Sequence, residues 1–105
     1  MKRFSRTLAS LRKEAGFHTS YAFYHRNGGR RIFPFTYAYY AKIERGCGLP
    51  RGEWLPLFLK LLKIESVSES REALLRDYLC DLFGDEEIFD FLVTPMFGER
   101  LAGRK

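Results

Sequence analysis

The sequence predicts an all-α fold of five to six short helices packed around one core. Apolar residues recur three or four positions apart in most segments, which is the period of an α-helix, and no segment shows convincing β alternation. Glycine or proline closes these segments at short intervals, as expected at helix ends. With 105 residues, of which 46% are hydrophobic and 16% aromatic, the chain can form one domain with a buried core.

The first two predicted helices lie close together near the N-terminus. Apolar residues recur at helical spacing over residues 4–15, and Gly16 stands where a helix would stop. Thr19 and Ser20 are suitable caps for a second helix that continues to about residue 27. Two short helices are therefore expected within the first quarter of the chain.

A loop and a third helix follow. Residues 28–35 begin with two glycines and contain Pro34, which disfavours helical geometry at the preceding residue, so we expect a loop there. Thr36 is a suitable cap for a third helix over residues 36–46, on which Tyr40 should face the core.

The second half of the chain predicts three more helices. Residues 52–63 are apolar on most sides, so this helix should be central. A wide apolar stripe over residues 68–83 predicts a fifth helix, and residues 85–93 predict a short acidic and aromatic sixth. Residues 98–105 resemble a frayed basic tail.

Charge is distributed unevenly along the chain. Residues 1–63 contain 13 lysines and arginines against 3 aspartates and glutamates, whereas residues 64–105 contain 5 against 10. A half this basic should concentrate a polyanion, and nucleic acid is the polyanion we expect. An acidic membrane surface and a purely solubilising role are the alternatives.

The composition argues against several other classes of protein. No apolar run approaches the roughly 20 residues needed to span a bilayer, and the basic N-terminus lacks the apolar stretch of a signal peptide. We therefore expect a soluble cytoplasmic protein. Cys47 and Cys80 lack Cys-x-x-Cys spacing, and His18 and His25 have no nearby cysteine, so no metal site is expected. No phosphate loop or catalytic set emerges, so we expect neither enzyme activity nor a cofactor.

Two motifs carry a resemblance to a known family. Residues 43–46 have the sequence Ile-Glu-Arg-Gly, followed by three residues, a proline and a leucine-rich helix that ends at residue 64. Residues 8–16, Leu-x-x-Leu-Arg-Lys-Glu-Ala-Gly, end the first helix. With the cap at Thr36, these motifs resemble the Xre-type, Cro and phage-repressor family of helix-turn-helix DNA-binding proteins.

The resemblance implies a lambda-repressor-like domain. It covers residues 8–64 and implies a helix-turn-helix DNA-binding core over residues 1–65. We expect residues 66–97 to be a C-terminal helical extension of the same domain, followed by the tail. The chain departs from the family pattern between Gly16 and Ile43, which is about seven residues longer than usual, mainly in the loop between the second and third helices.

The resemblance also implies which residues contact DNA. A helix that enters the major groove by its N-terminal end brings its first-turn side chains to base edges. The implied base contacts are Tyr37, Ala38 and Lys42. The implied backbone contacts are Thr19, Ser20, Tyr39 and Arg45. Arg30 and Arg31 are not family positions, but they lie in the enlarged loop and could contact phosphate or enter the minor groove.

One pair of residues is expected to have a structural role. In the family, a glutamate at the position of Glu44 pairs with an arginine at the position of Arg12. The same ion pair here would join the first helix to the third. It would also explain an acidic residue on an otherwise basic element.

The leading hypothesis is a sequence-specific transcriptional regulator that binds double-stranded DNA as a homodimer joined through residues 66–97. A competing explanation for that apolar segment is that its helices fold back and complete the core. One alternative function is a protein-interaction module, antitoxin-like or adaptor, that uses the acidic and aromatic C-terminal part. Another is a single-strand or RNA binder in which Tyr37 and Tyr39 stack on bases. No effector is indicated.

Overall fold

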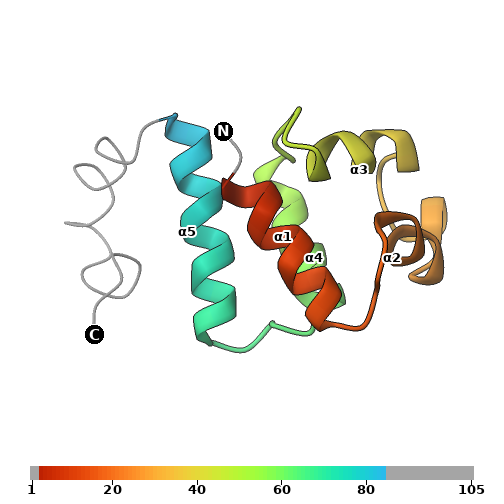
Figure 1. Cartoon of the computed structure of the whole chain (residues 1–105), viewed down its shortest axis with the longest axis horizontal. Coiled ribbons are helices and arrows are strands. Elements are labelled where there is room, and N and C mark those ends of the chain that lie inside the picture. The colour runs from red at the N-terminus through yellow and green to blue at the C-terminus, as the bar shows by residue number, and fades with distance from the viewer. Residues whose placement is uncertain (1–2, 85–105) are drawn as a thin grey trace.

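Helices make up the regular structure of residues 3–84, which are the residues that the computed structural model describes (Figure 1). The elements are α1 (Arg3–Glu14), α2 (Ser20–Arg26), the 3₁₀ turn η1 (Gly29–Arg31), α3 (Tyr37–Glu44), the 3₁₀ turn η2 (Gly52–Trp54), α4 (Leu55–Leu61) and α5 (Glu69–Phe83). This part of the chain contains no strand, which confirms the predicted all-α class. The predicted helix at 85–93 and the tail lie outside the described residues.

Hydroxyl side chains fix where three of these helices begin. Thr19 accepts a hydrogen bond from the amide of the residue three positions on, at 3.0 Å, and Thr36 does the same at 3.2 Å. Ser68 caps α5 in the same way. Each cap satisfies one of the amides that a helix leaves unpaired at its start. The caps of α2 and α3 are therefore where the sequence predicts them.

The fourth helix is shorter than its predicted span of residues 52–63. Its first three residues form η2, and the α-helix itself covers Leu55–Leu61. Pro56 lies in the first turn, where its missing amide hydrogen leaves no bond unmade. Lys63 adopts a left-handed conformation, with φ of 63°, directly after the helix. None of the helices described in residues 3–84 is long and apolar enough to cross a membrane.

The core lies where α1 meets the other helices. Figure 1 shows α5 alongside α1, α4 behind α1, and α3 and α2 at the other end of the molecule. Phe4 and Leu8 of α1, Phe58 of α4 and Leu74 of α5 are all fully buried. Aromatic rings fill much of this core, and the ring of Phe4 meets that of Phe58 edge to face.

The fifth helix packs chiefly against α1. Asp81 accepts a hydrogen bond of 2.8 Å from the amide of Phe4 at the start of α1, and Thr7 donates to Asp77 one turn along. Tyr78 is buried and donates to the carbonyl of Pro50 at 2.7 Å. Much of the apolar stripe of α5 therefore completes the core of its own chain.

The segment between α2 and α3 is more than a surface loop. Gly28 and Gly29 adopt positive φ angles and turn the chain into η1; a Cβ on Gly28 would come within 2.4 Å of the Ile32 side chain. The chain then returns to the core, where Phe33 and Phe35 are buried. The ring of Phe33 stacks on that of Tyr24 at 4.8 Å, and the Tyr24 hydroxyl donates to the carbonyl of Phe35. This segment thus contributes two rings to the core.

Phe33→Ala is expected to lower the free energy of unfolding by about 3–5 kcal/mol, because it removes a buried ring and leaves a cavity. Equilibrium unfolding in urea, followed by circular dichroism, measures the change. Ile32→Ala is the matched control: its side chain is 48% exposed, and the expected change is about 0.5 kcal/mol or less. Equally small losses in both variants would contradict this role of the segment.

Candidate nucleic-acid interface

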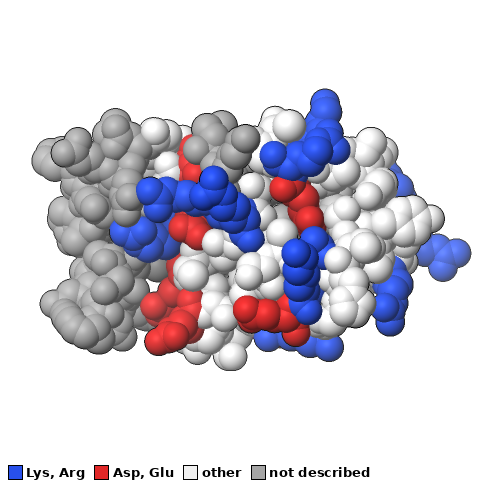
Figure 2. Space-filling view, in the orientation of Figure 1, with Lys and Arg blue, Asp and Glu red and all other residues white. Residues whose placement is uncertain are grey.

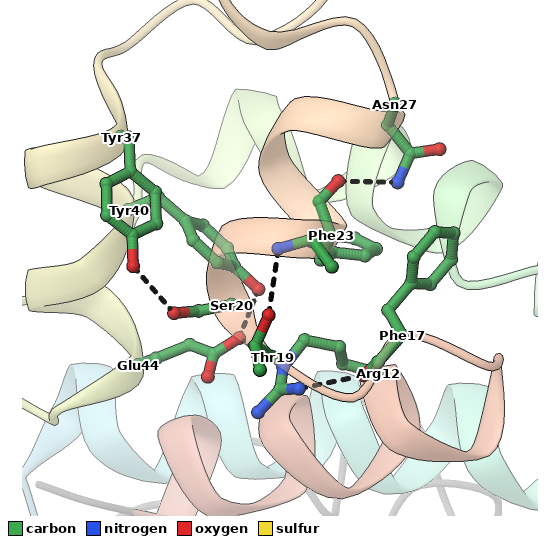
Figure 3. Close-up of polar contacts among 10 residues, drawn as sticks. Arg12, Phe17, Thr19, Ser20, Phe23, Asn27, Tyr37, Tyr40 and Glu44 are labelled. Atoms are coloured by element: carbon green, nitrogen blue, oxygen red, sulfur yellow. Dashed lines mark hydrogen bonds and ion pairs between the residues drawn. The ribbon is translucent and has the colours of Figure 1, made fainter.

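The helices α2 and α3 are joined through aromatic rings. Phe23 of α2 packs against Tyr40 of α3 with ring centres 5.6 Å apart, and Tyr24 packs against Tyr37 at 5.7 Å. At the surface end of this contact, the Ser20 hydroxyl and the Tyr37 hydroxyl are hydrogen-bonded at 3.1 Å (Figure 3). The two helices therefore present the first turn of α2 close to the first turn of α3.

An ion pair between Arg12 and Glu44 ties α3 to α1 (Figure 3). The Arg12 Nε donates to Glu44 Oε2 at 2.8 Å, and only 6% and 10% of the two side chains are exposed. The structure thus brings together the pair that the family resemblance implies. Charge-assisted bonds in a nearly dry setting are stronger than the same pair on a surface.

Tyr40 completes the environment of Glu44. Its hydroxyl donates to the same oxygen, Oε2, that receives the Arg12 bond. Burial of the ring and the neighbouring Glu44 carboxylate both raise the pKa of the Tyr40 hydroxyl well above its ordinary value. Tyr40 therefore stays protonated and remains a donor to Glu44 at physiological pH.

The same arginine also fixes the start of α2. Arg12 Nη1 donates to the carbonyl of Phe17 at 2.8 Å, in the short segment between α1 and α2. The Phe17 ring meets Phe23 edge to face at 5.3 Å, and the Arg26 guanidinium lies 5.6 Å from the centre of the Phe17 ring. One buried side chain, Arg12, thus holds α1, the entry to α2 and the end of α3 together.

The region formed by α2, η1 and α3 is basic. Residues 15–43 contain Arg26, Arg30, Arg31 and Lys42 but no aspartate or glutamate. Figure 2 shows lysine and arginine side chains at the α2 end of the molecule, whereas over α1 and α5 basic and acidic side chains lie side by side. The lack of acidic residues between positions 15 and 43 gives the α2–α3 region a positive potential, which would attract an anionic ligand.

Of the three predicted base contacts, two are open to solvent. Ala38 and Lys42 lie one turn apart on α3 and are exposed. Tyr37, the third implied base contact, is half-buried because its ring packs against α2 and its hydroxyl bonds to Ser20. Its ring is therefore held in place against α2.

The residues predicted to contact the DNA backbone differ in their exposure and in whether their polar groups already form hydrogen bonds. Thr19 is exposed, but its hydroxyl oxygen already caps α2. Ser20 is half-buried and shares its hydroxyl with Tyr37. Tyr39 is half-buried against the rings of Phe35 and Trp54, and Arg45 is exposed at the end of α3.

The two loop arginines lie at η1. Both are exposed, and Arg30 donates to the carbonyl of Phe33 at 2.9 Å, which orients its guanidinium. Arg30, unlike a freely rotating surface arginine, is therefore partly positioned before any ligand arrives. This position is also next to α2, which supplies Arg26 to the same basic region.

The aromatic surface of α2 was not predicted from the sequence. Tyr21 is 60% exposed, and its ring lies 4.2 Å from that of His25 and 5.4 Å from that of Tyr37. The signal was present in the spacing, because Tyr21 and His25 are four residues apart and so share a face of α2. The buried face of the same helix is formed by Phe23 and Tyr24.

No family model, curated protein or solved structure matches the chain. Over residues 3–84, no three histidine, cysteine, aspartate or glutamate side chains gather as they would around a metal ion. What the geometry does assemble in that range is a basic surface with exposed aromatic and alanine side chains, built on two short helices.

Arg12→Met is expected to lower the free energy of unfolding by about 3–5 kcal/mol, because it leaves the Glu44 carboxylate buried without its cation. Adding Glu44→Gln should recover part of that loss, and a double-mutant cycle in urea measures the coupling.

Arg51→Met is the matched control for that substitution. Arg51 pairs with Glu53 at 3.3 Å, but the two side chains are 67% and 61% exposed, so the expected loss is about 1 kcal/mol at most. Additive effects of the Arg12 and Glu44 substitutions would show that the two side chains do not support each other.

Proposed function

We propose that this chain binds double-stranded DNA through α2 and α3 and acts as a sequence-specific transcriptional regulator. The observation that carries the proposal is the pairing of two short, capped helices, α2 and α3, which the ion pair between Arg12 and Glu44 holds to α1. No acidic residue occurs between positions 15 and 43, so the surface of these helices is basic. A rigid helix pair and a positive surface are what a groove-reading protein needs.

The dimensions of DNA support α3 as the helix in the groove. The major groove is roughly 12 Å wide and admits one α-helix. The first turn of α3 carries exposed Ala38, and Lys42 follows one turn later. Lys42 suits the acceptor atoms of guanine, whereas Arg45, Arg30 and Arg31 suit phosphates on either side of the groove.

We further propose that the domain is of the lambda-repressor-like type. The motifs at residues 8–16 and 43–46, and the ion pair between Arg12 and Glu44, support this assignment. The longer connection between α2 and α3 would be accommodated by Phe33 and Phe35, which pack it onto the core.

A homodimer is part of the proposal, because one helix-turn-helix contacts too few base pairs to discriminate among genomic sites. Within the predicted extension, Leu82 and Phe83 at the end of α5 are 54% and 38% exposed and form no part of the buried core. The remaining predicted interface residues, Ile88 and those that follow, lie outside the described residues.

Binding to duplex DNA should weaken steeply as salt rises, by roughly 0.9 log units per tenfold salt for each phosphate neutralised. Arg45→Ala, and the pair Arg30→Ala with Arg31→Ala, should weaken binding to all sequences alike and flatten this slope. Lys42→Ala should relax the preference at one base position, by about 1–3 kcal/mol. Fluorescence anisotropy with labelled duplexes measures these effects.

Lys60→Ala is the control for those variants, because Lys60 is an exposed cation that belongs to α4 and not to α2, η1 or α3. Its salt slope should equal that of the unmodified protein. Equal weakening of all sequences by Lys42→Ala would contradict its role in base recognition. Full displacement of the duplex by an equal concentration of single-stranded competitor would favour a single-strand binder.

Sedimentation at micromolar concentration should show a dimer, and the combined change Leu82→Ser with Phe83→Ser should shift it toward monomer because it removes exposed apolar surface. Ile32→Ser is the control, since Ile32 is 48% exposed and lies outside residues 66–97. A protein that stays monomeric while bound to its target duplex would overturn the dimer and leave DNA binding intact.

A further inference from the structure

The α2–α3 surface carries a patch of apolar side chains among its basic ones. Tyr21 and Ala38 are exposed, and Tyr37 and Ala41 are half-buried beside them. The rings of Tyr21 and Tyr37 meet edge to face at 5.4 Å, and Ala41 is one helical turn after Tyr37 on α3. We call these four residues the tyrosine–alanine face.

Few groups on this face can form hydrogen bonds with bases. From Tyr37 to Ile43, α3 contains no asparagine, glutamine, arginine, aspartate or glutamate, the side chains that pair with base edges most specifically. The Tyr37 hydroxyl is already paired with Ser20. Lys42 is the remaining cation of the helix, so hydrogen bonding alone would distinguish few base pairs.

Thymine carries an apolar group that the tyrosine–alanine face can contact without hydrogen bonds. Its C5-methyl group is the one apolar feature displayed in the major groove, and alanine and aromatic side chains are suitable contacts for it. Arg26, Arg30, Lys42 and Arg45 are exposed in the same α2–α3 region and make it positive, which favours DNA over a protein partner as the occupant. An apolar patch within a basic region fits a methyl group carried on a polyanion.

We infer that the tyrosine–alanine face recognises the methyl groups of thymine, so that target sites carry thymines at the positions opposite Tyr21, Tyr37 and Ala38. This inference rests on the proposed binding of duplex DNA. It assigns sequence selection to van der Waals contact, with Lys42 adding one polar contact. Each methyl group buried on this face should contribute about fourfold in affinity.

The test compares two copies of one duplex, the tightest binder selected from a random duplex library by the full-length chain. One copy contains thymidine, and the other contains deoxyuridine, which lacks only the methyl group and keeps the same hydrogen-bonding atoms. The deoxyuridine copy is expected to bind at least about fourfold more weakly at constant salt. Tyr21→Ala and Ala38→Gly should each bring the affinity ratio of the two copies closer to one.

Lys60→Ala is the control, because it shortens an exposed side chain of α4, which belongs neither to this face nor to residues 66–97, and should leave the ratio unchanged. Thermal unfolding of each variant verifies that it is folded. Equal binding of both copies by the unmodified protein would overturn this inference and leave the proposed function standing. An unchanged ratio in both face variants would also overturn it. Failure to select any binding duplex would overturn the proposed function itself.

Discussion

The buried ion pair between Arg12 and Glu44 is the constraint on which the arrangement of the first three helices depends. Arg12 reaches α3 through Glu44 and the entry to α2 through the carbonyl of Phe17, while Tyr40 donates to Glu44 from within the core. Removing these charges from water is costly, and the hydrogen bonds that Arg12 donates to Phe17 and that Glu44 accepts from Tyr40 help to offset that cost. Because Arg12 bonds to both segments, the ion pair fixes how α2 and α3 are oriented relative to α1.

Aromatic packing extends that constraint to the surface. Tyr24 stacks on Phe33, which anchors the long connection between α2 and α3, and Tyr37 packs against α2 from the first turn of α3. Close-packed rings resist small displacements, because losing contact on one side forfeits dispersion energy without compensation by water. The exposed ring of Tyr21 and the methyl group of Ala38 are thus presented by a stiff support, as a recognition surface requires.

The sequence predicted what depends on short-range signals. The caps Thr19 and Thr36, the inward face of Tyr40 and the all-α class all follow from spacing within one or two helical turns. What it could not predict depends on packing between distant residues. Phe33 returns to the core by stacking on Tyr24. The packing of α5 against α1 includes the hydrogen bond from the amide of Phe4 to Asp81. Neither contact leaves a periodic trace in the sequence.

The proposed function requires the first turns of α2 and α3 to form the DNA-binding surface. Titration of the isotopically labelled protein with a selected duplex, followed by amide chemical shifts in NMR spectra, locates the surface that contacts DNA. The largest changes should fall on residues 19–22 and 36–42, with the amides of α5 nearly unaffected. Changes centred on α5, with those two segments unmoved, would contradict it.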